Sequence, residues 1–359
     1  MKALDFINAL KENGISDFTG VPCSTFKPVI HHLEKSEHYI IASSEGEAMG
    51  IAAGISLSGN TPAVFMQNDG FGNTVNPLTS LTKLYEFPTL LVISWRGEPG
   101  VKDAPQHVWS GKTLLELMKV FEIEYHILTD ELEADKKEIK RLIDLAKNEN
   151  KVCAIICRKE IFEKEKIEQT VSEELLSRMQ AIETALSEIE DEIPIFSTTG
   201  MPSREIYQVK DRKNNFYTVG SMGCTSSIAF GYFLKTKKKV AVFDGDGAVL
   251  LKMGTLATLG YYQPEKLLHI CLDNESYEST GGQSTISTKI ILSDVAIAAG
   301  YKNVKLVKSK DEITEFIKKW KANPSLSFLH IKVKNQTDHN IGRPKESPAE
   351  LKKRFMETN

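Results

Sequence analysis

The sequence has little of what marks secreted, membrane-spanning or nucleic-acid-binding proteins. Its five cysteines are scattered, and none forms a Cys-x-x-Cys pair. No apolar run approaches the length of a transmembrane helix, and residues 1–13 lack the apolar core of a signal peptide. The net charge of −3 offers no basic field for nucleic acid or an anionic membrane. We therefore expect a cytoplasmic protein with reduced thiols that binds neither nucleic acid nor membranes.

The common nucleotide-binding fingerprints are missing as well. Neither Gly-x-x-x-x-Gly-Lys-Ser/Thr nor Gly-x-Gly-x-x-Gly occurs in the sequence, which argues against an ordinary nucleotide-binding α/β protein. What is present is a balanced composition, 41% apolar and 26% charged, that is typical of soluble globular proteins. A length of 359 residues predicts two domains.

Short apolar runs alternate with helical patterns along the whole chain, which is typical of parallel α/β architecture. In the first half, strands are predicted near 15–19, 39–42, 61–66, 89–94, 124–128 and 152–157, and helices near 3–13, 26–34, 46–58, 75–86, 110–121 and 130–148. In the second half, strands are predicted near 193–197, 215–219, 239–243, 267–272, 303–307 and 326–333. We expect two doubly wound parallel-sheet domains, 1–165 and 177–359, joined by a charged linker over 166–176.

Polar side chains follow two of the predicted strands in the second half. Gly245-Asp246-Gly247 comes after one strand and Asp273-Asn274 after another. Open α/β sheets place their ligands at the carboxyl ends of strands. Asp246 and Asn274 can supply two hard oxygen ligands to one Mg²⁺, and the helix that opens after Asp246 has free N–H groups that suit a phosphate. The residues therefore predict a Mg²⁺-diphosphate site, although Gly-Asp-Gly taken alone could be an ordinary strand-to-helix turn.

The spacing of these two motifs resembles the cofactor signature of thiamine diphosphate (ThDP) enzymes, Gly-Asp-Gly followed by Asn-Asn. Asp273 replaces the first Asn, while Asn274 keeps the metal-binding position. The resemblance implies a third Mg²⁺ ligand, the backbone carbonyl of Ser276. It also implies that Met222 supports the bent cofactor, although a core methionine would be the simpler interpretation. The implied cofactor-binding residues are Thr199, Gly200, Ser221, Met222, Gly245, Gly247 and Ala248.

A carboxylate also follows a predicted strand in the first half. Glu45 lies just past the apolar run 39–42, where desolvation suits a proton-sharing role. Its offsets to Ala48 and Gly54 resemble the pyrimidine-domain motif of ThDP enzymes, which implies that Glu45 hydrogen-bonds the aminopyrimidine ring. Glu47 is the rival carboxylate but lacks these offsets. The simple alternative is a pair of solvated carboxylates at a helix start.

Longer stretches narrow the resemblance to the phosphonopyruvate decarboxylase family over nearly the whole chain. They are Gly20 to Ser24, Met66 to Gly70 with Gly72-Asn73, Trp95 to Gly100, Ala104 to His107, Ser279 to Ser284, and Gly342-Arg343-Pro344. The resemblance implies a pyrimidine-binding and a diphosphate-binding domain, no middle domain, and homo-oligomers with active sites between subunits. It implies conversion of 3-phosphonopyruvate to phosphonoacetaldehyde and CO₂, a step in phosphonate biosynthesis. Sulfopyruvate decarboxylase and a non-catalytic ThDP-fold binding protein are the alternatives.

A substrate that carries both a carboxylate and a phosphonate needs fixed hydrogen-bond donors. Arg96 offers a planar fork for phosphonate oxygens, unless it forms a surface ion pair. His107 could donate or handle a proton, unless it is an ordinary loop histidine. Two adjacent glycines could form an anion-binding nest or a plain turn. We expect Glu45 and His107 to be catalytic, and the substrate contacts to be Ser24, Asn73, Arg96, Gly281, Gly282 and Gln283.

Overall fold

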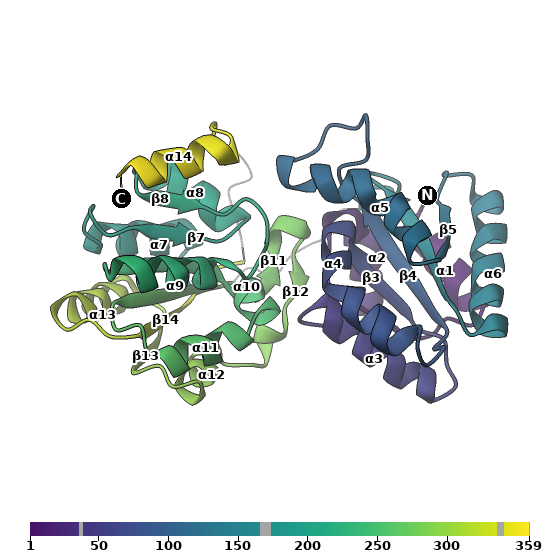
Figure 1. Cartoon of the computed structure of the whole chain (residues 1–359), viewed down its shortest axis with the longest axis horizontal. Coiled ribbons are helices and arrows are strands. Elements are labelled where there is room, and N and C mark those ends of the chain that lie inside the picture. Colours follow the sequence, from purple (N-terminus) through teal and green to yellow (C-terminus); the bar gives the residue numbers. More distant parts are fainter. Residues whose placement is uncertain (36–38, 166–173, 336–340, 359) are drawn as a thin grey trace. The chain divides into compact units, whose positions relative to one another are not determined.

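The computed structural model describes residues 1–35, 39–165, 174–335 and 341–358. The chain forms two compact units, Met1–Glu168 and Gln169–Asn359 (Figure 1). Residues 166–173 of the predicted linker lie outside the described residues. No helix among those described is long and apolar enough to cross a membrane.

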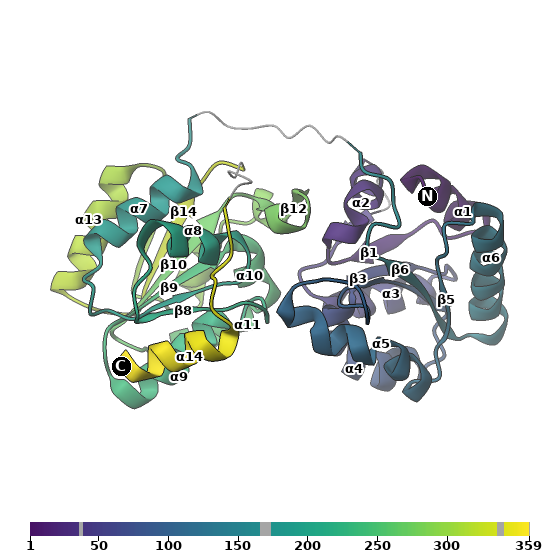
Figure 2. The ribbon, with the colours of Figure 1, turned by 90° about the horizontal axis from the view of Figure 1, so that it is seen from above.

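The first unit is built on a six-stranded parallel sheet with the order β2-β1-β3-β4-β6-β5. Its strands are β1 (Phe18–Gly20), β2 (Tyr39–Ile41), β3 (Ala63–Gln67), β4 (Thr89–Trp95), β5 (Glu124–Ile127) and β6 (Val152–Arg158). Its helices are α1 (Ala3–Glu12), α2 (Lys27–Glu34), α3 (Glu45–Leu57), α4 (Asn68–Pro77), α5 (Val108–Val120) and α6 (Leu132–Glu149). Helices α1, α2 and α6 bury one face of the sheet and α3, α4 and α5 the other, as Figure 2 shows. Cover on both faces explains why the central strand β4 is buried throughout and mostly apolar.

The second unit repeats this architecture with the order β13-β14-β10-β9-β7-β8. Its strands are β7 (Ile195–Ser197), β8 (Asn215–Tyr217), β9 (Val240–Gly245), β10 (Leu267–Asp273), β13 (Asn303–Val307) and β14 (Ser327–Lys332). Its helices are α7 (Arg178–Glu188), α8 (Met201–Lys210), α9 (Thr225–Thr236), α10 (Asp246–Leu251), α11 (Gly254–Tyr262), α12 (Leu292–Ala298), α13 (Lys310–Ala322) and α14 (Pro348–Thr358). A small antiparallel hairpin, β11 (Ser276–Tyr277) with β12 (Gln283–Ser284), follows β10.

The fold class predicted from the sequence is confirmed, and every predicted strand is present with small shifts at its ends. The starting residue predicted for one helix is wrong. Instead of beginning near residue 75, α4 begins at Asn68, directly after β3, and continues into a short π-helix, Leu78–Thr82. The sequence around Gly70 and Gly72 has weak helix propensity. The helix forms because Asn68 has tertiary partners: its Nδ2 donates to Arg96 O at 2.7 Å, and its Oδ1 accepts from Arg96 N at 3.0 Å.

Candidate active site

Glu45 is the first residue of α3 and is buried, with 6% of its surface exposed. Asn73 of α4 donates from Nδ2 to Glu45 Oε2 at 2.8 Å. A Cβ at Gly70 would lie only 2.1 Å from Glu45 Oε1, so the absence of a side chain at Gly70 lets the carboxylate approach α4. The structure therefore holds Glu45, at the start of α3, against α4. Asn73, which is predicted to be a substrate contact, also donates to this carboxylate.

The rival carboxylate, Glu47, has a structural role. It is exposed, and its Oε2 accepts from Ser43 N at 2.8 Å and from Ser43 Oγ at 2.5 Å. In return, Ser44 Oγ accepts from Glu47 N at 3.3 Å. These bonds satisfy N–H groups at the start of α3, which is the usual task of an acidic residue in the first helical turn. Glu45 is therefore the buried carboxylate of the pair, and Glu47 is part of the helix cap.

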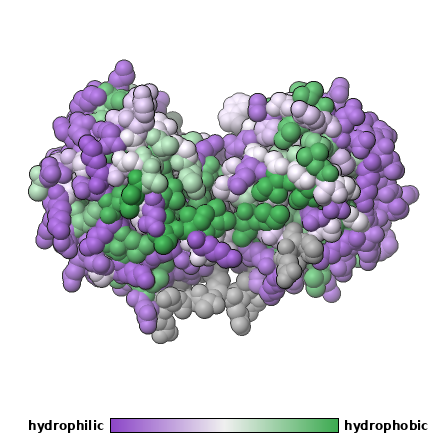
Figure 3. Space-filling view, turned by 90° about the horizontal axis from the view of Figure 1, so that it is seen from below, coloured by the Kyte–Doolittle hydropathy of each residue, from purple (hydrophilic) through white to green (hydrophobic). Residues whose placement is uncertain are grey.

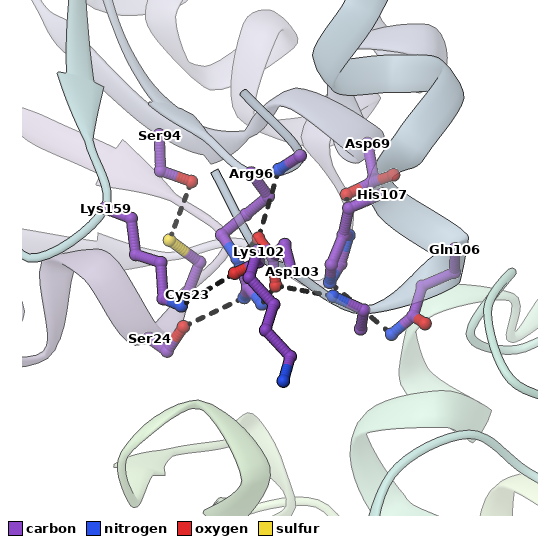
Figure 4. Close-up of polar contacts among 12 residues, drawn as sticks. Cys23, Ser24, Asp69, Ser94, Arg96, Lys102, Asp103, Gln106, His107 and Lys159 are labelled. Atoms are coloured by element: carbon purple, nitrogen blue, oxygen red, sulfur yellow. Dashed lines mark hydrogen bonds and ion pairs between the residues drawn. The ribbon is translucent and has the colours of Figure 1, made fainter. Parts of the chain in front are cut away.

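The loop that follows β4 brings Arg96 and Ser24 together (Figure 4). Arg96 Nη1 donates to Ser24 Oγ at 3.1 Å. On its other edge, Nε donates to Asp103 Oδ2 at 2.7 Å and Nη2 to Asp103 Oδ1 at 2.5 Å. Although burial alone would raise the pKa of Asp103, the hydrogen bond from Arg96 holds that pKa well below its ordinary value. Arg96 thus forms an ion pair within the chain, and the pair is largely buried, with side chains 14% and 6% exposed.

His107 lies at the end of the same loop, at the junction of a 3₁₀ turn, Pro105–His107, and α5. Its Nδ1 is 2.5 Å from Asp69 Oδ2, and Ser110 Oγ donates to Asp69 Oδ1 at 2.5 Å. Gly97 has a φ of +70°, and a Cβ there would lie 1.9 Å from the carbonyl oxygen of His107. The two ends of the loop are therefore packed against each other. Asp69 was not predicted as a site residue, although a carboxylate two residues past β3 is a signal of the same kind as Glu45.

Asp246 is the first residue of α10 and is almost fully buried, with 2% of its surface exposed. Its Oδ2 accepts from Thr285 Oγ1 at 2.5 Å and lies 3.0 Å from Ser287 Oγ. Burial, and then the charge of Asp273, raise the pKa of Asp246 to about 7. Neither hydroxyl residue was predicted, because both belong to a segment with no motif of its own. A buried carboxylate in this state needs either a proton or a nearby cation.

Asp273 has compensating partners on the neighbouring strand β14. Lys332 Nζ lies 2.7 Å from Asp273 Oδ2, and so does His330 Nε2. Ser293 N donates to His330 Nδ1 at 3.3 Å, so the ring proton is on Nε2, which donates to Asp273. Although burial opposes it, these bonds lower the pKa of Asp273. The carboxylate at this position, which departs from the Asn-Asn signature, is therefore neutralised within the chain.

Asn274 is held by a buried charged cluster. Its Nδ2 donates to Glu278 Oε2 at 3.0 Å, and its Oδ1 accepts from Ser276 N at 3.2 Å. Arg178 Nη1 donates to the same Glu278 oxygen at 2.6 Å and forms a two-point pair with Glu205 at 2.7 and 2.9 Å. Two buried oxygens, Ser276 Oγ and Glu278 Oε1, have no hydrogen-bond partner among the described residues. The amide of Asn274 is thus oriented by its neighbours.

The predicted diphosphate-binding turns lie within the second unit. Thr199 Oγ1 donates to Val219 O at 2.7 Å, which joins the turn after β7 to the segment before Ser221. Gly200 has a φ of +93°, a conformation that glycine adopts without cost. A Cβ at Gly247 would lie 2.6 Å from the ring of Tyr277, so a side chain would not fit at the start of α10. Met222 is partly exposed rather than a core residue.

The remaining predicted substrate residues in this unit lie in the turn of the β11–β12 hairpin. Gly281 and Gly282 have φ values of +132° and +83°, and Gly282 N donates to Tyr277 O at 3.1 Å. Gln283 is buried, and its Oε1 accepts from Thr280 Oγ1 at 3.1 Å. The glycine pair therefore lies in a hairpin turn.

The donor atoms near Asp246 suit a small hard cation. The predicted ligands are a carboxylate, the side-chain oxygen of Asn274 and the carbonyl of Ser276, all oxygen atoms of the kind that Mg²⁺ prefers. The raised pKa of Asp246 fits the same view, because a cation beside it would offset both causes of the shift. No cluster of three or more His, Cys, Asp or Glu residues suited to a metal occurs in the described part of the chain.

Comparison with known proteins finds a family match in each of the two units. Residues 3–114 match the N-terminal TPP binding domain of thiamine pyrophosphate enzymes, and residues 198–331 match their C-terminal TPP binding domain. The chain is 33% identical to a phosphonopyruvate decarboxylase of Streptomyces viridochromogenes, over 98% of this chain and 94% of that protein. It is 32% identical to a phosphonopyruvate decarboxylase of Streptomyces hygroscopicus, over 99% and 94%. It is also 32% identical to a sulfopyruvate decarboxylase of Methanosarcina acetivorans, over 98% and 96%.

Proposed function

The chain belongs to the thiamine diphosphate-dependent decarboxylases, and from that premise we propose that its substrate is 3-phosphonopyruvate. The products would be phosphonoacetaldehyde and CO₂, a step of phosphonate biosynthesis. The observation that carries the proposal is similarity over almost the entire chain to two phosphonopyruvate decarboxylases. Five free cysteines support the expectation of a reducing, cytoplasmic setting.

The second unit would hold the cofactor through Mg²⁺. Asp246, Asn274 and the carbonyl of Ser276 are the proposed metal ligands, and the N–H groups at the start of α10, at Gly247 and Ala248, would face phosphate oxygens. The turns at Thr199 and Gly200 and the segment Ser221-Met222 would complete the contacts. When bound, thiamine diphosphate supplies a nucleophilic carbon and an electron sink for the loss of CO₂.

Glu45 would hydrogen-bond the aminopyrimidine ring and share its proton. Its burial and the hydrogen bond that it accepts from Asn73 support this role, because a carboxylate held in one position can meet the ring without reorganisation. Glu45 and Asp246 belong to different units of the chain. We propose that the two groups of each active site come from two subunits of a homo-oligomer.

Two observations within single units support the oligomer. A Cβ at Gly50 or Gly54 of α3 would meet no atom within 4 Å, so this helix has open space beside both glycines. Figure 3 shows apolar areas on the surface of both units. Large exposed apolar side chains include Leu57, Leu84, Trp109, Tyr261 and Tyr262, each more than half exposed. Contiguous apolar areas on the surface of a soluble protein often mark a face that a partner covers.

The substrate would meet donors from both units. The guanidinium of Arg96 has five N–H bonds, and three of them donate to Asp103 and Ser24, which leaves two for a phosphonate. Gly281, Gly282 and Gln283 in the hairpin of the second unit are the other proposed contacts. His107 would handle the proton that the reaction consumes.

The test is a cofactor and product analysis of the purified protein. With 3-phosphonopyruvate we expect CO₂ release that requires both ThDP and Mg²⁺, and equimolar phosphonoacetaldehyde identified by ³¹P NMR. Dialysis against a chelator should abolish the activity, and returning Mg²⁺ should restore it. Tight ThDP binding without CO₂ release from any 2-oxo acid would indicate the non-catalytic alternative. The second candidate substrate is sulfopyruvate, which the similarity to a sulfopyruvate decarboxylase favours.

A further inference from the structure

Asp69 and His107 form a pair whose geometry is set on both sides. Asp69 is the second residue of α4, and its two carboxylate oxygens have separate partners. Oδ2 lies 2.5 Å from His107 Nδ1 (Figure 4). Oδ1 accepts from Ser110 Oγ at 2.5 Å. The His107 side chain is 8% exposed, while that of Asp69 is 30% exposed. With both oxygens engaged, the carboxylate is fixed in one orientation and fixes the ring.

These contacts determine where the proton of a neutral His107 sits. A carboxylate can only accept, so Nδ1 must carry the hydrogen and donate it to Asp69. On the other side of the ring, the amide nitrogen of Gln106 lies 3.4 Å from His107 Nε2, which suits an acceptor at that atom. The neutral ring is therefore the Nδ1–H tautomer, and Nε2 is the nitrogen free to take up and release a proton.

The same pair ties the histidine to the proposed anion contact. Asn68, which precedes Asp69 in α4, holds the backbone of Arg96 at both N and O. Two consecutive residues thus contact the two ends of the loop from Arg96 to His107: Asn68 binds its first residue and Asp69 its last. The charge of Asp69 also acts on Arg96. Asp69 of α4 is the charged residue for which a direct contact with His107 is seen in the described part of the chain.

We propose that Asp69 positions His107 as the proton donor of the decarboxylation, a role that rests on the proposed function. Decarboxylation of a 2-oxo acid consumes one proton: the bond to the carboxylate breaks, CO₂ leaves, and the carbon keeps the electron pair. In the proposed step, His107 starts with protons on both ring nitrogens and gives the Nε2 proton to that carbon, so the product aldehyde gains its hydrogen and the ring is left as the neutral Nδ1–H tautomer. The imidazole then recovers a proton from solvent. Asp69 never contacts substrate and acts through the orientation and tautomer of His107.

The first test is the variant Asp69→Asn, which keeps the size of the side chain but offers an amide N–H to the ring. Since an amide can stabilise the wrong tautomer, we expect kcat to fall by about 10²–10⁴-fold, the usual range for a positioned acid or base, with KM changed by only a few-fold. Asp69→Glu should restore part of the loss. Glu116→Gln on α5 is the matched control, because it removes one carboxylate from a side chain that is 70% exposed. An unchanged kcat for Asp69→Asn would overturn the proposal.

The second test reads the tautomer without turnover. ¹⁵N-histidine NMR of the holoenzyme, with the His107 signals assigned from His107→Ala, should give an Nδ1–H pattern in the wild type and a shifted pattern in Asp69→Asn. An active wild type with the Nε2–H pattern would overturn the role of Asp69 alone. A wild type with the Nδ1–H pattern but no activity on any 2-oxo acid would overturn the proposed function, and the proton-donor role with it.

Discussion

Arg96 and Asp103 form a two-point ion pair, Nε to Oδ2 at 2.7 Å and Nη2 to Oδ1 at 2.5 Å. The pair uses the side edge of the guanidinium and leaves its outer N–H groups for a ligand. The N–H donors of Arg96 that the sequence suggested for a phosphonate are thus shared: some donate to Asp103, and others are left for the proposed substrate. Asp103 fixes the plane of the Arg96 guanidinium. Because Asp103 also offsets part of the positive charge of Arg96, only part of that charge is available to a substrate.

Arg96→Lys should weaken the substrate contact because an ammonium keeps the charge but cannot serve Asp103 and a phosphonate with a planar fork. We expect phosphonopyruvate binding to weaken by about 1.5–3 kcal/mol, the range for hydrogen bonds to charged groups. Pyruvate, which lacks the phosphonate, should lose far less. KM or Kd for both compounds provides the measurement. Equal losses for the two would exclude Arg96 as the phosphonate anchor.

Asp103→Asn should make stability depend on pH in a defined direction. The pKa of Asp103 is lower in the folded protein than the ordinary value of 3.8. Its contribution is therefore fully present above about pH 5 and is lost as pH falls through 3.8 toward the folded-state pKa. Urea midpoints of the wild type and the variant should differ at pH 7 and converge as pH falls below 4. A constant difference across this range would contradict the ion pair.

Glu45→Gln and Glu47→Gln form a matched pair, since the two residues lie in the same helical turn. We expect Glu45→Gln to bind ThDP but lose about 10²–10⁴-fold in turnover, because an amide cannot share the proton of the cofactor ring. Hydrogen–deuterium exchange at the thiazolium carbon should slow in parallel. Glu47→Gln should change both within a few-fold and lower helix stability slightly. Unchanged exchange in Glu45→Gln would assign the role to another group.

Glu278→Ala should weaken Mg²⁺ binding although Glu278 is not a proposed metal ligand. Its oxygen orients the Asn274 amide and receives Arg178, so removing it frees the amide to rotate. Loss of such supporting groups typically costs 10–100-fold in metal affinity. Calorimetric titration with Mg²⁺ and ThDP measures the change. The control is Glu275→Ala, which removes a nearby carboxylate with a 45% exposed side chain. Equal effects in both would argue against orientation as the cause.

Subunit mixing tests the shared active site. Glu45→Gln and Asp246→Ala should each be inactive, the second because Mg²⁺ and ThDP are lost. If the groups of one site come from two chains, dissociating and reassociating the two variants together should recover up to about one quarter of the sites, by random pairing of subunits. Native mass spectrometry must confirm that mixed oligomers form. Mixed oligomers without activity would place both groups of a site on one chain.

The sequence predicted those parts of the molecule that depend on local pattern. Apolar runs located the strands, and the residues just past them, Glu45 and Asp246, are buried at strand ends as expected. The start of α4 was wrong because its stability comes from the contact of Asn68 with Arg96, far along the chain, rather than from helix propensity.

Contacts between residues that loops bring together could not be predicted from the sequence. Nothing in it indicated that Asp103 would take one edge of Arg96, or that Asp69 would hold His107. Thr285 and Ser287 reach Asp246 only because the hairpin after β10 returns them to it. Asp273 looked like a departure from the cofactor signature, and the reason for it became visible only with Lys332 and His330 on the next strand.

Substrate choice is the central claim, and the ratio of kcat/KM for 3-phosphonopyruvate to that for sulfopyruvate tests it most directly. The two substrates share the 2-oxo acid and differ by one negative charge at the other end. If the outer N–H groups of Arg96 receive a phosphonate, its additional charge should be worth at least about 1.4 kcal/mol, and the ratio should exceed about tenfold. Both assays use the same enzyme with saturating ThDP and Mg²⁺ and measure CO₂ release. A ratio near one, or a preference for sulfopyruvate, would contradict the assignment to phosphonopyruvate.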